Sequence, residues 1–207
     1  MGDDIEAVLF DYGGVLSTSP FEAFTRHERD RGLPDGFIRS LNTTNPDDNA
    51  WARLERNELD FDQFCTAFEE EARAAGGTVD ARVLFGSFTG EIRPQMVEAV
   101  RRCRARFKTG LLTNNFVTGV TTGDRPEILD LFDAVVASSA VGVRKPDPRF
   151  YLLACEVLDI EPATAVFLDD LGVNLKPARD LGMRTIKVTD PAEAVRQLEQ
   201  VVGISLH

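Results

Sequence analysis

The sequence predicts an α/β fold in which a doubly wound, Rossmann-like parallel sheet is interrupted by an inserted helical segment. Two observations indicate this fold. Short apolar runs alternate with amphipathic helical patterns at both ends of the 207-residue chain, and residues 17–93 contain helical patterns but no convincing buried strand. We therefore expect a core formed by residues 1–16 and 94–207, with residues 17–93 forming a helical cap.

The expected strands are continuous apolar runs without polar alternation, which is typical of strands covered on both faces. Each run is followed by a turn or a helical pattern, as right-handed crossovers between parallel strands require. The four clear runs are Ala7 to Phe10, Thr109 to Thr113, Ala134 to Ala137 and Ala165 to Leu168, and Ile186 to Val188 is a weaker fifth.

Three helices of the expected core begin at a proline, a residue favoured in the first helical turn. They begin at Pro94, at Asp147-Pro148 and at Asp190-Pro191, where Glu193 completes a plausible capping box. After each proline, apolar residues recur at helical spacing along the sequence. These helices are the expected crossovers of the sheet.

The inserted segment contains three helical patterns. Helices are expected to start near Phe21 and near Trp51, and the clearest one follows Asp60, with Gln63 placed for capping. We interpret its numerous phenylalanines as the hydrophobic core of the cap. A loop is expected at Thr118 to Pro126, near the second strand.

Composition narrows the class of partner and the compartment. The net charge of −11 argues against nucleic acid as the main partner, because phosphate backbones need clustered Lys and Arg. No apolar run reaches the roughly 18 residues of a membrane span, and the acidic start does not fit a secretory signal. Three dispersed cysteines fit a reduced compartment. We expect a cytoplasmic monomer or homodimer whose partner is a small molecule.

Chemically suggestive residues follow the expected strands in a fixed order. Asp11 follows the first strand, Thr113-Asn114-Asn115 ends the second, Lys145 comes shortly after the third, and Asp169-Asp170 follows the fourth. Ligands of open parallel sheets bind beyond the carboxyl ends of the strands. A lone aspartate there is usually a cap or turn residue, but an acid, a hydroxyl, an amine and paired acids together indicate a site.

The residue types favour phosphoryl transfer through an aspartate. The Asp11 carboxylate would attack phosphorus to form an aspartyl-phosphate, which water then hydrolyses. Mg²⁺ held by Asp11 and Asp170 would cancel the repulsion between the two anions. Thr113, Asn114 and Lys145 would bind the remaining phosphate oxygens. Two glycines after Asp11, Gly13 and Gly14, let the backbone approach the phosphate closely.

Four motifs resemble those of the haloacid dehalogenase-like (HAD) hydrolase superfamily, and they occur in the same order. The segment from Phe167 to Gly182 is also similar to the phosphatase domain of soluble epoxide hydrolases and to the hydrolase segment fused to some acyl-CoA dehydrogenases. The motifs are Phe10-Asp11-Tyr12-Gly13-Gly14-Val15, Leu112-Thr113-Asn114-Asn115, Arg144-Lys145-Pro146 and Phe167-Leu168-Asp169-Asp170.

The resemblance implies a HAD core with an inserted cap and assigns roles within it. Asp11 would be the nucleophile and a metal ligand, with the Gly13 backbone carbonyl as a second ligand. Asp170 would be the direct carboxylate ligand of the fourth motif, with Asp169 nearby or acting through water. Lys145 would link nucleophile and phosphate, and Asn174 matches a residue that supports the Asp169 loop.

One acid of the family pattern is missing. HAD phosphatases carry a second aspartate two residues after the nucleophile, as general acid and base, and that position is Gly13 here. Because general acid–base catalysis is worth about 10²–10⁴-fold, we expect a slow phosphatase or one limited to good leaving groups. Glu55 or Glu58, in a turn between two expected cap helices, is a candidate substitute, although an ordinary charged turn explains both.

Two alternatives therefore remain beside a Mg²⁺-dependent phosphatase. Metal-independent haloacid dehalogenases also use an aspartate nucleophile and lack the second aspartate, but they generally carry Tyr at the position of Gly13, and here the tyrosine is Tyr12. The other alternative is a non-catalytic domain that binds a phosphorylated ligand. The substrate itself is not predictable from the sequence, since one fold supports many chemistries.

Overall fold

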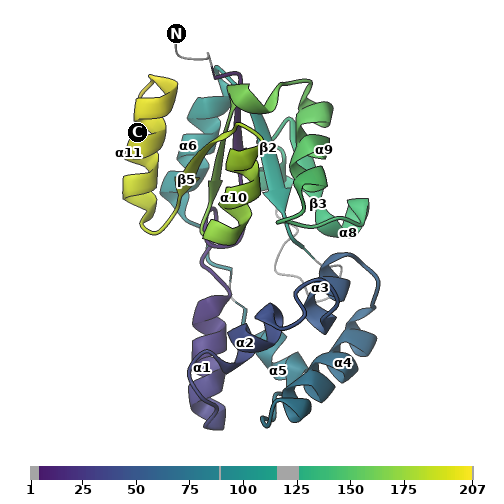
Figure 1. Cartoon of the computed structure of the whole chain (residues 1–207). Helices are drawn as coiled ribbons and strands as arrows, with labels where there is room; N and C mark the ends of the chain where they lie inside the picture. Colours follow the sequence, from purple (N-terminus) through teal and green to yellow (C-terminus); the bar gives the residue numbers. More distant parts are fainter. Residues whose placement is uncertain (1–4, 89, 116–125, 207) are drawn as a thin grey trace.

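A five-stranded parallel sheet forms the centre of the molecule, in the strand order β3-β2-β1-β4-β5 (Figure 1). The computed structural model describes residues 5–88, 90–115 and 126–206. The α/β class expected from the alternating pattern is confirmed. The strands are β1 (Ala7–Phe10), β2 (Lys108–Thr113), β3 (Ala134–Ala137), β4 (Ala165–Asp169) and β5 (Arg184–Lys187).

The four clear apolar runs coincide with strands to within one residue at each end. β1 and β4 are buried throughout, whereas Val135 of β3 is exposed although it is apolar. The fifth strand was predicted too late, at 186–188, and spans Arg184–Lys187 instead. It lies at an edge of the sheet, and in it only Ile186 is buried. Unlike β3 at the other edge, whose four residues are all apolar, β5 contains Arg184, Thr185 and Lys187, so a search for continuous apolar runs misses its start.

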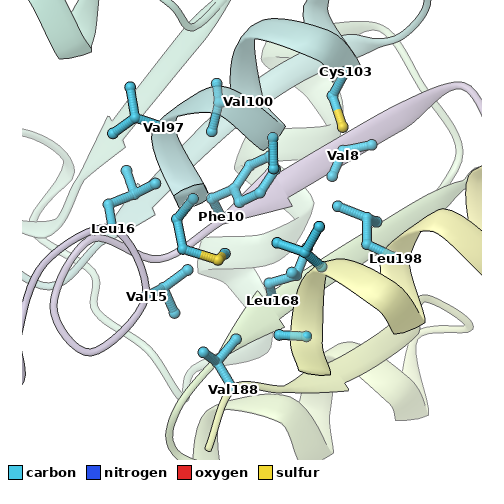
Figure 2. Packing of buried hydrophobic residues seen from close by; sticks show 14 of the residues in the cluster. Val8, Phe10, Val15, Leu16, Val97, Val100, Cys103, Leu168, Val188 and Leu198 are labelled. Atoms are coloured by element: carbon cyan, nitrogen blue, oxygen red, sulfur yellow. The ribbon is translucent and has the colours of Figure 1, made fainter. Parts of the chain in front are cut away.

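Helices cover both faces of the sheet and bury two hydrophobic clusters. One cluster packs α6 and α11 on the face formed by Val8, Phe10 and Leu168 (Figure 2). The other packs α9 and α10 against Leu9 and Phe167. The helices of this part are α6 (Pro94–Arg104), α7 (Pro126–Leu129), α8 (Ser138–Val141), α9 (Pro148–Leu158), α10 (Gly172–Asp180) and α11 (Pro191–Val202), with a 3₁₀ turn at Pro162–Thr164.

Five helices between β1 and α6 form a separate layer beyond one end of the sheet (Figure 1). They enclose a third hydrophobic cluster, in which the Trp51 ring lies 5.2–6.4 Å from the rings of five phenylalanines. We call this layer the cap. Its helices are α1 (Phe21–Arg31), α2 (Phe37–Thr43), α3 (Ala50–Glu55), α4 (Phe61–Ala74) and α5 (Ala81–Gly86).

Local signals predicted some helix starts better than others. The Asp60 and Gln63 capping box before α4 forms in both directions. Before α11, Asp190 accepts a hydrogen bond from the Glu193 amide, but the Glu193 carboxylate binds Arg196 and Gln197 instead, so the predicted box is only half formed. The sequence patterns did not reveal α2 and α5, which have only seven and six residues.

Two chain segments connect the cap to the core, and they pair with each other. The Thr18 amide donates to the Glu91 carbonyl at 2.8 Å, and the Arg93 amide donates to the Leu16 carbonyl at 2.8 Å. The connection therefore leaves the core directly after the Asp11 turn. Of the loop expected at 118–126, only Pro126 lies within the described residues, where it begins α7. Among the helices that the structure describes, none is long and apolar enough to cross a membrane.

Candidate active site

The pairing of the central strands brings three expected site residues to one end of the sheet. β1 lies between β2 and β4, so Asp11, Thr113 and Asp169 all stand at the carboxyl ends of adjacent strands. The Asp11 amide continues the β1–β4 ladder by donating to the Leu168 carbonyl at 2.9 Å. Parallel strands end at the same edge, which explains how residues more than 150 positions apart in the sequence come together.

Lys145 is at the centre of this group. Its Nζ lies 2.8 Å from Asp11 Oδ1 and 2.8 Å from Asp169 Oδ2, and the side chain is only 1% exposed. The ammonium also lies 5.4 Å from the centroid of the Phe167 ring. A buried lysine needs such partners, because an unpaired ammonium in the interior is costly. The structure thus joins three of the expected site residues directly.

Polar side chains hold this group in place from behind. Asn114 fixes the backbone of Lys145 from both sides, since its Oδ1 accepts from the Lys145 amide at 2.8 Å and its Nδ2 donates to the Lys145 carbonyl at 2.9 Å. Asn174 Nδ2 donates to both oxygens of Asp169, and Tyr151 donates to the Asn174 carbonyl at 2.6 Å. In this structure Asn114 therefore orients the lysine loop, a role that its motif alone did not indicate.

Asp170 lies against the glycine turn that follows β1. A Cβ atom added to Gly14 would stand 2.2 Å from Asp170 Oδ2, and Gly14 has a φ of +78°. Only glycine fits there, for both steric and conformational reasons. Arg93 donates to the Gly14 carbonyl at 2.6 Å. Gly14 and Asp170, which lie far apart in the sequence, thus meet at this turn.

The acids of the group repel one another. Burial raises the pKa of Asp11 well above its ordinary value, and nearby Asp169 and Asp170 raise it further, whereas Lys145 lowers it. Burial and the Asp169 charge raise the pKa of Asp170 to about 6, again against Lys145. For Lys145, burial lowers the pKa, but the Asp11 and Asp169 charges outweigh that effect and raise it.

This charge balance fits a divalent cation. Asp11, Asp169 and Asp170 each offer a carboxylate oxygen within 4.8 Å of the others. With all three carboxylates ionised, the one ammonium would leave two negative charges uncompensated in a mostly buried place, and a bound cation would favour that ionised form. An all-oxygen set with few protein ligands is what Mg²⁺ prefers. Asp169 already accepts from Lys145, Asn174 and the Leu171 amide, so Asp11 and Asp170 have more capacity left for an ion.

The position of the missing acid has room for a side chain. A Cβ atom added to Gly13 would meet nothing closer than Pro20 Cδ at 3.8 Å, an ordinary contact distance. Unlike Gly14, Gly13 does not have a positive φ. The absence of a carboxylate at residue 13 is therefore not imposed by crowding of the backbone.

A cavity of about 700 Å³ opens onto these groups and extends between core and cap. Asp11, Thr113, Lys145 and Asp170 line its core side. On the cap side, aromatic rings line the wall together with charged and polar side chains such as Arg26, Arg39 and Asn42. The aromatic residues of that wall are Phe21, Phe24, Trp51 and Phe88.

The two candidate acids of the cap have different surroundings. Glu55, at the end of α3, lines the cavity and is buried, with its oxygens 2.8 Å from Trp51 Nε1 and 2.6 Å from Arg144 Nε. Glu58 is half exposed and pairs with Arg56 at 2.6 Å. Arg144 is partly buried in this pair. No local sequence signal joins residues 55 and 144.

The fold and this group of residues are those of a HAD-like hydrolase, and the comparisons agree. The model of the haloacid dehalogenase-like hydrolase family matches residues 5–182, and the chain belongs to this family. It is 36% identical over its whole length to acyl-CoA dehydrogenase family member 10 of Mus musculus. Over 98% of its length it is 34% identical to bifunctional epoxide hydrolase 2 of Sus scrofa. It spans only 20% and 40% of these two relatives.

A shorter relative matches over most of both chains. Phosphatase MT3486 of Mycobacterium tuberculosis is 32% identical over 203 residues, which cover 89% of this chain and 87% of that protein. The expected resemblance to the family is therefore confirmed.

Solved structures share the fold at low identity. A HAD-like hydrolase from Porphyromonas gingivalis aligns with a TM-score of 0.70 at 21% identity, covering 97% of this chain and 99% of its own. A HAD family enzyme from Bacteroides thetaiotaomicron, in complex with magnesium and inorganic phosphate, aligns at 0.60 and 20% identity, covering 88% and 93%. An L-2-haloacid dehalogenase from Xanthobacter autotrophicus aligns at 0.58 and 22%, covering 98% and 84%.

Proposed function

We propose that this protein is a Mg²⁺-dependent phosphatase that hydrolyses a small phosphate monoester through an aspartyl-phosphate on Asp11. The observation that carries the proposal is the meeting of Asp11, Asp170 and Lys145 at one cavity. The relative named as a phosphatase and the neighbour crystallised with magnesium and phosphate support it. Asp11 and Asp170, with the Gly13 carbonyl, would hold the ion, and Asp169 would support them from behind.

In the first step, an Asp11 carboxylate oxygen attacks phosphorus and the bond between phosphorus and the ester oxygen breaks. Lys145 keeps Asp11 oriented through Oδ1 and offers positive charge to the transferred group. Thr113 lines the cavity beside these groups and would donate to a phosphate oxygen. Bound Mg²⁺ would supply charge that offsets the repulsion between the carboxylate and the phosphate.

In the second step, water attacks the phosphorus of the aspartyl-phosphate, which releases inorganic phosphate and restores Asp11. Gly13 has no side chain to protonate the leaving oxygen or to activate this water. We therefore assign these proton transfers to water in the cavity or to the substrate. Because positioned acid–base catalysis contributes about 10²–10⁴-fold, turnover should be slow or should favour good leaving groups.

The cavity wall indicates the kind of organic group that the ester carries. Phe21, Phe24, Trp51 and Phe88 present aromatic surface opposite the charged end of the cavity. Ligand pockets of several hundred Å³ with a few convergent polar groups bind mostly through apolar contact. The proposal therefore favours an organic group with an apolar part that contacts these rings. A cytoplasmic location and a monomeric or homodimeric state stay predictions.

A phosphate-release screen with and without Mg²⁺ tests the proposal directly. The wild type should release phosphate only with Mg²⁺, and Asp11→Asn should lose at least about 10³-fold in kcat/KM, since a nucleophile cannot be replaced by an amide. Gly13→Asp should gain turnover, because the backbone leaves space for its Cβ. Gly13→Ala is the matched control, which fills the same space without a carboxylate.

The same screen separates the two alternatives. Halide release from 2-haloacids without metal would favour a dehalogenase, the activity named for one of the structural neighbours. Ligand binding without turnover across the phosphate panel would favour a non-catalytic domain. Turnover that Asp11→Asn leaves unchanged would exclude Asp11 as the nucleophile. The uncompensated negative charge of the three carboxylates supports the metal-dependent reaction over the dehalogenase.

A further inference from the structure

The cap and the core are packed independently, so a specific contact must set their relative position. The buried apolar residues of α1–α5 form one cluster, and those on the two faces of the sheet form two others. The paired linkers beside Leu16 and Arg93 give one attachment. A second attachment lies across the cavity, where α3 of the cap meets α8 of the core.

Three polar contacts join the cap to the core at this second attachment. Glu55 lies 2.6 Å from Arg144 across the boundary, and the Glu55 backbone carbonyl accepts from the Ser138 hydroxyl at 2.6 Å. Arg144 also donates to the Pro46 carbonyl at 2.8 Å. Ser138 is fully buried and the Glu55 side chain is only 8% exposed. The pair is an ion pair without a well-aligned hydrogen bond, since Glu55 Oε2 and Arg144 Nε have no hydrogen-bond partner among the described residues. Shielding from solvent strengthens the attraction between the two charges.

Each partner is rigidly attached to its own region. On the cap side, Glu55 accepts from Trp51, whose ring is at the centre of the aromatic cluster. On the core side, Arg144 directly precedes Lys145, whose backbone is fixed on both sides by Asn114. The pair therefore connects the centre of the cap to the loop that carries the buried lysine of the site.

We propose that Glu55 and Arg144 form a clasp that sets the position of the cap over the site, so that Arg144 is a positioning residue for the reaction. When the pair is formed, the aromatic wall lies opposite the phosphate end of the cavity. The pair also restrains the loop that carries Lys145. The effect on catalysis rests on the proposed phosphatase activity. The effect on the cap does not, and it is measured separately.

Trp51 reports on the clasp without any assay of activity, since it is the only tryptophan of the chain and donates directly to Glu55. We expect Arg144→Gln and Glu55→Gln each to increase acrylamide quenching of Trp51 at least about twofold. Hydrogen exchange of the paired linker amides at Thr18 and Arg93 should accelerate in the same variants, because the cap can then swing about this connection. Far-UV circular dichroism checks that the variants are folded.

The double variant Glu55→Gln/Arg144→Gln keeps the result interpretable if a single variant unfolds. Removing one partner leaves a buried charge unpaired, whereas removing both does not. The double variant should still show increased quenching and faster exchange. Arg56→Gln is the matched control, because its pair with Glu58 lies in the same turn but entirely within the cap. It should leave quenching and exchange at wild-type values.

In the phosphate-release assay, Arg144→Gln and Glu55→Gln should lower kcat/KM by about tenfold or more, as misplacement of a positioned group does. Arg144→Lys should recover part of the loss, and the pH dependence of kcat should keep its shape. If Glu55 were instead the substitute acid, its variant alone would lose turnover and change the pH profile. Wild-type quenching, exchange and kcat/KM in the double variant would overturn the clasp, whereas changed quenching in a protein without turnover would refute only the proposed function.

Discussion

The core and the cap place opposite kinds of surface on the two sides of one cavity. The core side is a network of charged and polar groups in which Lys145, Asp169 and Asn174 are buried and hydrogen-bonded. The cap side carries aromatic rings that belong to the cluster around Trp51, with charged side chains such as Arg26 and Arg39 beside them. Electrostatics therefore governs the region where the reaction is proposed, and apolar packing governs the region that would contact the organic part of a substrate.

This difference predicts that the two regions fail in different ways. Removing a charge from the core should change chemistry or ion binding with a small effect on packing, because neighbouring charges repel one another. Removing apolar volume from the cap should change stability locally, because its hydrophobic cluster is separate from those of the core.

Phe68→Ala should destabilise the cap by about 3–5 kcal/mol, the usual cost of removing a buried aromatic ring. Phe68 is fully buried, and its ring lies 5.2 Å from that of Phe64 and 6.1 Å from that of Trp51. In thermal unfolding, Trp51 fluorescence should change at a lower temperature than far-UV circular dichroism. Two separate transitions would show that the cap unfolds before the core.

Leu168→Ala is the matched change in the core, where Leu168 is fully buried on β4. It should cost about 2–5 kcal/mol, and both signals should change together, since the sheet supports the whole molecule. Coincident transitions in Phe68→Ala as well would contradict the contrast and make cap and core one cooperative unit.

Mg²⁺ should stabilise the protein through the core alone. At 100 times its dissociation constant, an ion that binds only the folded state adds about 2.7 kcal/mol to the free energy of unfolding. Because Asp11 and Asp170 are the proposed ligands, Asp170→Asn should lose this gain. Thermal unfolding with Mg²⁺ and with a chelator measures it, with Asp62→Asn as a control at an acid whose side chain is 79% exposed. Equal stabilisation of both variants would place the ion elsewhere.

The sequence predicted the positions of the core residues better than the contacts of the cap. Asp11, Thr113 and Asp169 were placed together from the sequence alone, because parallel strands end at one edge and four of the five strands are continuous apolar runs. The fifth strand was shifted because most of its residues are polar, unlike those of β3 at the other edge. In the core, therefore, a repeating physical rule connects local pattern to three-dimensional position.

The cap has no such rule. Its helices α2 and α5 are too short for a clear hydrophobic period, and the pair of Glu55 and Arg144 joins residues 89 positions apart without any local signal. The bonds from Asn114 to the Lys145 backbone escaped prediction for the same reason, since they depend on how two loops meet. Roles set by such tertiary contacts need coordinates.

Gly14→Ala and Gly13→Ala compare two adjacent positions of the core turn. Gly14→Ala should destabilise the protein by at least about 1–2 kcal/mol, because its φ of +78° is unfavourable for alanine and the new Cβ would collide with Asp170. It should also weaken Mg²⁺ binding by displacing that carboxylate. Gly13→Ala should do neither, since its Cβ meets only Pro20 at 3.8 Å. Thermal unfolding and Mg²⁺ titration measure both effects, and equal behaviour of the two variants would be inconsistent with the turn described above.

Thiol labelling compares the local stability of cap and core with the smallest perturbation, because it follows local opening in the unmutated protein. Cys65 lies in α4 of the cap, and Cys103 and Cys155 lie in the core. Burial raises the pKa of Cys103 to about 12 and that of Cys155 to about 11, so at pH 8 these thiols hold little of the reactive thiolate.

Labelling with a disulfide reagent at pH 8, followed by mass spectrometry of peptides, should therefore modify Cys65 several times faster than the two core cysteines. Burial also raises the pKa of Cys65, so its reaction requires opening of the cap. Phe68→Ala should accelerate the labelling of Cys65 and leave Cys103 unchanged, whereas Leu168→Ala should accelerate all three. If Cys103 reacted as fast as Cys65 in the wild type, opening would involve the sheet itself, and the cap would not be the less stable region.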